Sequence, residues 1–76
     1  MEKRIVNECF VVGWSTVGKR GLAGNYFRYS RRFSEYDEAN AKFIAVQKKE
    51  RTAYAYIDKR IEYENNYVKI IRIDHM

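Results

Sequence analysis

The chain of 76 residues has no proline, one histidine, one cysteine and no long apolar run. The single cysteine, Cys9, cannot form an internal disulfide or supply a thiolate cluster for zinc, which is typical of a reducing compartment. The longest fully apolar stretch, residues 9–12, is far too short for a signal-peptide core or a membrane span. We therefore expect a cytoplasmic chain that does not enter a membrane.

Residue types used in catalysis and metal binding are equally sparse. His75 is next to the last residue, Cys9 lies in a predicted strand, and no carboxylate pair stands apart from the general charge pattern. Residues 13–19 spell most of a phosphate-binding P-loop, but Arg20 follows where serine or threonine is required, and a second strand is predicted there instead of a helix. The sequence predicts no catalytic residues, no cofactor and no metal site.

Positive charge, by contrast, is plentiful and unevenly distributed. The net charge is +5, and residues 1–33 hold seven basic and two acidic residues, whereas residues 34–76 hold eight of each. The whole excess therefore lies in the first part of the chain. Such asymmetry indicates a surface that meets an anionic partner, and ordinary solubility charge is the alternative interpretation.

Hydrophobic periodicity predicts four strands and one helix. Residues 4–14 and 25–33 are expected to form a hairpin, with all four glycines of the chain between Gly13 and Gly24 predicting its long loop. Ser34 is the expected cap of a helix over about residues 35–50. A second hairpin is expected from residues 52–63 and 67–73. The prediction is one α+β domain over residues 1–76, a ββαββ chain whose four-stranded antiparallel sheet carries the helix on one face.

The predicted core follows from the same periodicity. In the helix, a stripe of Tyr36, Ala39, Phe43 and Val46 is expected to pack on the sheet. In the second strand, Phe27, Tyr29 and Phe33 are expected to point inward. The outward set there is Tyr26, Arg28, Ser30 and Arg32.

Tyr54 and Tyr56 lie on one side of the third strand, opposite the side that holds Ala53 and Ala55. Small alanines suit a place beneath a helix, so we expect both tyrosines on the helix-free face, as an aromatic patch of the kind enriched at interfaces. The alternative places the two tyrosines in the core.

Two functions fit these features. Arginines interleaved with aromatic residues predict non-specific nucleic-acid binding by the N-terminal hairpin, because guanidinium groups contact phosphates and rings stack on bases. The alternative is a protein interaction module, such as a small inhibitor or adaptor of a phage or mobile element, that docks its open sheet face on an acidic protein surface. A core this thin also favours a homodimer. The candidate binding residues are Lys19, Arg20, Tyr26, Arg28, Arg32, Tyr54 and Tyr56.

Overall fold

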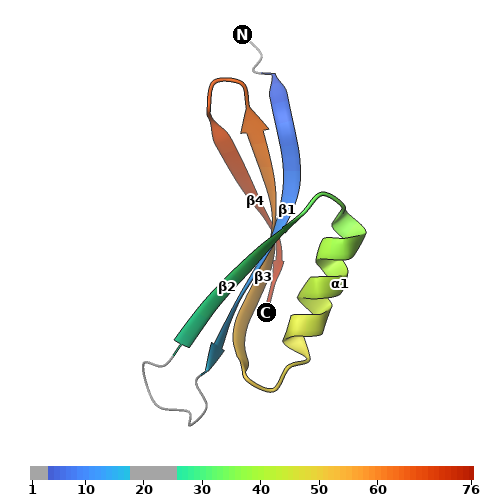
Figure 1. Ribbon diagram of the computed structural model, residues 1–76, viewed down its shortest axis with the longest axis vertical. Helices are drawn as coiled ribbons and strands as arrows, with labels where there is room; N and C mark the ends of the chain where they lie inside the picture. Colours follow the sequence, from blue (N-terminus) through green and yellow to red (C-terminus); the bar gives the residue numbers. More distant parts are fainter. Residues whose placement is uncertain (1–3, 18–25) are drawn as a thin grey trace.

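The computed structural model describes residues 4–17 and 26–76, with Tyr26 described by its backbone alone. Its elements are β1 (Ile5–Val17), β2 (Tyr26–Phe33), α1 (Tyr36–Gln47), β3 (Thr52–Tyr63) and β4 (Val68–His75). The strands form one antiparallel sheet in the order β2-β1-β3-β4, with α1 on one face (Figure 1). The predicted α+β fold, its ββαββ order and its four-stranded sheet are confirmed.

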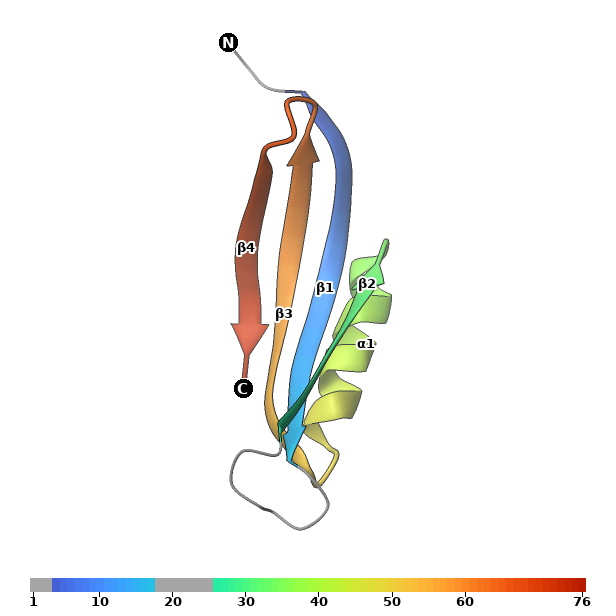
Figure 2. The same ribbon diagram turned by 60° about the vertical axis from the view of Figure 1, so that its left-hand side comes forward.

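The helix covers only part of this long sheet. The molecule measures 52 × 25 × 15 Å, and α1 lies against β1, β2 and β3 at one end (Figure 2). Within the described residues α1 makes no contact with β4. The strands at the other end therefore have no helix against either face. No helix of the described part is long and apolar enough to cross a membrane.

The hydrophobic core lies between α1 and the two central strands. Six buried residues form it, namely Val12 of β1, Ala39, Phe43 and Val46 of α1, and Ala55 and Ile57 of β3. Five of the six are 0% exposed, and Phe43 is 3% exposed. Phe10, Trp14 and Phe33 are partly buried around this cluster. The alanine of β3 leaves room for the helix, as its small size predicts.

The helix confirms most of the predicted stripe and corrects its start. Ala39, Phe43 and Val46 are buried, whereas Tyr36 is 42% exposed and contacts Phe10 edge-on. The N-cap residue is Glu35, without a capping hydrogen bond from its side chain, so the prediction of a Ser34 cap is wrong.

The second strand departs from its predicted burial. The register places Phe27 and Tyr29 opposite Thr16 and Trp14, on the helix side of the sheet, yet they are 54% and 48% exposed. β2 is an edge strand, and α1 does not cover this part of it. The Tyr29 ring instead stacks on Trp14, with 5.6 Å between ring centroids. The prediction that Phe27 and Tyr29 are buried is therefore wrong.

The first strand is three residues longer at its end than expected, because it continues from Trp14 to Val17. Within it, Gly13 pairs with Ser30 on one side and Tyr56 on the other. The glycine permits a close approach by Tyr56 of the neighbouring strand.

Candidate binding face

The sheet face opposite α1, called the open face below, is defined by strand register. Val12, Ala55 and Ile57 face the helix, so the residues that alternate with them face away. The open face comprises Cys9, Val11, Gly13 and Ser15 of β1, Arg28, Ser30 and Arg32 of β2, Tyr54, Tyr56, Asp58, Arg60 and Glu62 of β3, and Val68, Ile70, Arg72 and His75 of β4.

The structure brings four of the predicted site residues together on the open face. Arg28 pairs with Ser15 across β1, and Ser15 pairs with Tyr54 on the other side, so the two sets predicted separately belong to one surface. The predicted position of Tyr54 and Tyr56 on the helix-free face is confirmed.

The remaining predicted residues are not placed. Lys19 and Arg20 lie outside the described residues, and only the backbone of Tyr26 is described, opposite Val17.

The ring of Tyr56 lies across the β1 backbone at Gly13. A Cβ atom at position 13 would be 2.2 Å from Cζ and 2.3 Å from the hydroxyl oxygen of Tyr56, far inside van der Waals contact. Tyr56 pairs directly opposite Gly13, so the missing side chain creates the space into which this ring leans. Glycine is required here for close approach, within a regular strand.

Arg72 fixes the other contacts of this aromatic pair. Its guanidinium carbon lies 4.4 Å from the centroid of the Tyr56 ring, and its Nη1 donates a hydrogen bond of 3.0 Å to the Tyr54 hydroxyl oxygen. The Tyr54 and Tyr56 rings meet edge to face, with 6.2 Å between centroids. One arginine thus holds both tyrosines, and it already covers part of the Tyr56 ring.

The carboxylate of Asp58, on the neighbouring strand β3, neutralises the charge of Arg72. The Nε of Arg72 donates a hydrogen bond to Oδ1 of Asp58, and Nη2 lies 3.5 Å from Oδ2. The hydrogen bond with Asp58 raises the pKa of Arg72 above its already high ordinary value, so the guanidinium stays charged. Asp58 is only 8% exposed, and a buried carboxylate of this kind needs such a partner. The pair therefore anchors the tyrosines to the sheet.

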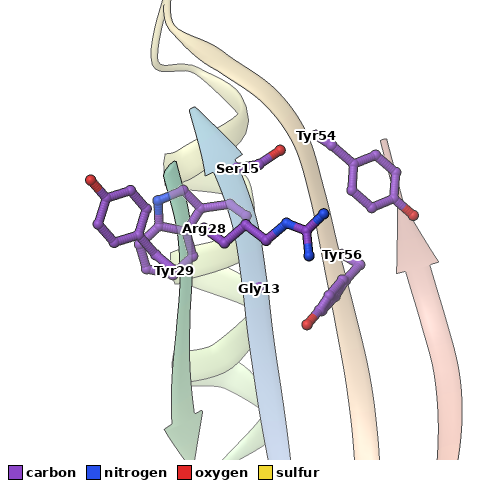
Figure 3. Close-up of a pocket in the computed structure, with 7 residues that line it drawn as sticks. Gly13, Ser15, Arg28, Tyr29, Tyr54 and Tyr56 are labelled. Carbon is purple, nitrogen blue, oxygen red and sulfur yellow. The ribbon is translucent and has the colours of Figure 1, made fainter. Parts of the chain in front are cut away.

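A shallow pocket lies beside this network. Its volume is about 330 Å³, and it is lined by Gly13, Trp14, Ser15, Arg28, Tyr29, Tyr54 and Tyr56. Figure 3 shows the Arg28 side chain extending from β2 across β1 towards Tyr56. Arg28 is exposed, and no acidic group of the described residues pairs with it. Trp14 and Tyr29 belong to the helix side of the sheet by register, so the open face contributes to this pocket the Arg28 cation, the Ser15 hydroxyl and the phenol rings of Tyr54 and Tyr56.

A second cluster of charges lies further along the open face. Arg60 donates a hydrogen bond of 3.2 Å from Nε to Oε1 of Glu62, and Nη1 of Arg32 is 3.9 Å from the same oxygen. The Arg32 side chain remains 61% exposed. Four arginines thus share the open face with two carboxylates, which leaves it positive.

Sequence reasoning missed Gly13, Ser15, Asp58 and Arg72 as parts of this site. Asp58 carried a usable signal, because it shares the strand side of Tyr54 and Tyr56. Arg72 and Gly13 carried none, since their roles depend on which strands become neighbours.

Comparison of the chain with known protein families, curated proteins and solved structures finds no significant match. Among the described residues no group of three histidine, cysteine or acidic side chains is placed to hold a metal ion.

Proposed function

We propose that this protein is a non-enzymatic binding protein whose open face holds single-stranded nucleic acid without sequence specificity. The observation that carries the proposal is the pocket in which Arg28 lies beside Tyr54 and Tyr56. Proteins that bind single strands combine a positive surface for the backbone with aromatic rings on which bases stack. The open face supplies both elements within one surface.

The contacts of each residue on the open face indicate which part of a nucleic acid it would bind. Arg28, without an acidic partner in the described chain, and the exposed Arg32 supply phosphate contacts. Tyr54 is 40% exposed and offers its ring to a base. Tyr56 is covered by Arg72 and held over Gly13, so it forms the wall of the pocket and positions Tyr54.

Single strands fit this surface better than duplexes. Stacking on a tyrosine requires an unstacked base, which a duplex does not offer to a flat sheet face. No helix or β-ribbon of the described residues projects from the open face to enter a major groove. A duplex would make phosphate contacts without stacking, so we expect it to bind more weakly than a single strand.

The test is a fluorescence anisotropy titration of labelled homopolymeric oligonucleotides, in single-stranded and duplex form, over a series of salt concentrations. Affinity for single strands should fall with salt by about 0.7 log units per log unit of salt for each phosphate contact. Arg28→Ala and Arg32→Ala should each flatten the slope by about that amount. Tyr54→Leu should weaken binding by about 1 to 3 kcal/mol, whereas Tyr54→Phe keeps the ring and most of the affinity.

Two exposed lysines that follow α1 and do not belong to the open face provide the matched control. Lys48 and Lys49 follow α1 and have the same charge as the arginines, so their replacement by alanine should leave the affinity nearly unchanged. Absence of oligonucleotide binding by the wild-type chain at low salt would refute the proposal. Equal losses from the lysine and arginine variants would reduce it to general electrostatic attraction.

A protein partner is the second candidate function, and the exposed isoleucines of β4 favour it. We propose self-association as the form that this interaction takes. The strand that carries it is β4, an edge of the sheet, and its pairing does not depend on nucleic-acid binding.

A further inference from the structure

β4 forms one edge of the sheet and pairs only with β3 in the described structure. Its isoleucines are exposed, Ile70 at 61%, Ile71 at 40% and Ile73 at 39%. They occupy both faces of the sheet, and no contact with α1 covers them. An edge with unpaired backbone groups and apolar side chains is a template for another strand.

Charge distinguishes the two edges of the sheet. β2 carries Arg28, Arg31 and Arg32 and no acidic residue, so antiparallel pairing of two β2 strands centred on Ser30 would place Arg28 opposite Arg32 of the other copy. Like charges directly opposite each other destabilise a strand pair. β2 is therefore protected against self-pairing, and β4, with charges of both signs, is not.

A bulge in β4 makes its own charges complementary. Ile61 pairs with Lys69 and Ile57 pairs with Asp74, but the register shifts by one residue at Ile73. The shift brings Asp74 to the helix side of the sheet, where Lys69 also lies. Without the bulge the alternation of side chains would put Asp74 on the opposite face from Lys69.

We propose that a second copy of the chain pairs antiparallel with β4 about a two-fold axis at Ile71. In this register Ile71 faces Ile71 of the other copy, and Lys69 of each copy faces Asp74 of the other on the same side of the sheet. Ile70 lies beside the aliphatic stem of Arg72 on the opposite side. The sheet runs through both copies, with both open faces on one side.

The test is sedimentation velocity of the full chain from low to high micromolar concentration. Wild type should move from one chain of 9.2 kDa towards twice that mass. Ile71→Lys should keep the mass at that of one chain, because it places two lysines face to face at the axis. The control is Ile44→Lys, the same substitution at an isoleucine of α1 that is 43% exposed, which should still form the dimer.

Charge reversal tests the register itself. Lys69→Asp should abolish the dimer by placing two carboxylates opposite each other on each side of the axis. Adding Asp74→Lys should restore it, since the reversed pairs are again complementary. Circular dichroism of each variant checks that the domain is folded.

Three outcomes would overturn the proposal. A wild-type chain that stays monomeric at high micromolar concentration removes the second copy and leaves the edge for an extended segment of another protein. A dimer that survives Ile71→Lys lies elsewhere on the surface. A double variant that does not regain the dimer contradicts the register.

Discussion

The two faces of the sheet are built from alternate residues of the same strands, yet they are organised by different interactions. On the helix side Val12, Ala55 and Ile57 are fully buried and pack against apolar residues of α1. On the open face the Arg72 guanidinium makes a cation–π contact with the Tyr56 ring, and Tyr54 remains 40% exposed. Substitutions on the helix side should therefore act on stability alone, whereas substitutions on the open face should also change the proposed binding.

Phe43→Ala should have the largest effect on stability. The side chain is 3% exposed in the centre of the core, and its removal leaves a cavity that costs about 3 to 5 kcal/mol. Urea denaturation followed by circular dichroism measures the loss, which in a domain of this size approaches the entire stability. Ile44→Ala, at the neighbouring exposed position, should cost only about 0.5 kcal/mol, and a similar loss from both variants would contradict the described core.

Gly13→Ala should be the most damaging change on the open face. The added methyl group must displace the Tyr56 ring from its place over β1, at a cost of about 1 to 3 kcal/mol. The cost should disappear in a Tyr56→Leu background, where alanine is the better strand residue. Denaturation of the four chains in this double-mutant cycle measures the coupling. Equal costs in both backgrounds would show that the ring does not occupy the described position.

Asp58→Asn should separate stability from binding by moving them in opposite directions. Loss of the carboxylate should cost about 1 kcal/mol of stability, a value reduced because the Arg72 side chain is 45% exposed and screened by water. The released guanidinium adds a positive charge to the proposed binding face, so the salt slope of oligonucleotide binding should steepen by about 0.7. Weaker binding by this variant would mean that the ordered tyrosines matter more than the added charge.

Lys42→Ala should have the smallest effect of the four. The Lys42 ammonium group lies 4.8 Å from the centroid of the Trp14 ring on the helix side, a contact that contributes about 0.5 to 1 kcal/mol. Its removal should change the fluorescence of Trp14, the only tryptophan, and leave oligonucleotide affinity unaltered. Lys48→Ala is the control, with neither change expected.

The sequence predicted features that depend on local periodicity. The element order, the helical stripe of Ala39, Phe43 and Val46, and the placement of Tyr54 and Tyr56 opposite Ala55 all follow from which residues share a face of one element. Such patterns need no knowledge of neighbouring strands. The same reasoning was wrong about the burial of Tyr36, because a stripe predicts which residues face the sheet and not how completely each is covered: Tyr36 contacts Phe10 and still remains 42% exposed.

Features that depend on pairing between strands were not predictable. Gly13 lies within the predicted strand, but its role was not predictable, because a glycine permits both a turn and close approach of a neighbouring strand, and only the pairing of β1 with β3 distinguishes the two. Phe27 and Tyr29 alternate correctly but belong to an edge that α1 does not reach. The bulge at Ile73 is equally invisible, since it exists only relative to β3.

The position of Tyr56 over Gly13 has a consequence for magnetic resonance. A proton held close to the face of an aromatic ring is shielded by the circulating π electrons, and the Gly13 hydrogen that points where a Cβ would be is such a proton. We expect one Gly13 α-proton resonance to move strongly upfield in the folded chain and to return to its ordinary position in Tyr56→Leu. A single line in the spectrum would thus report whether the open face is assembled.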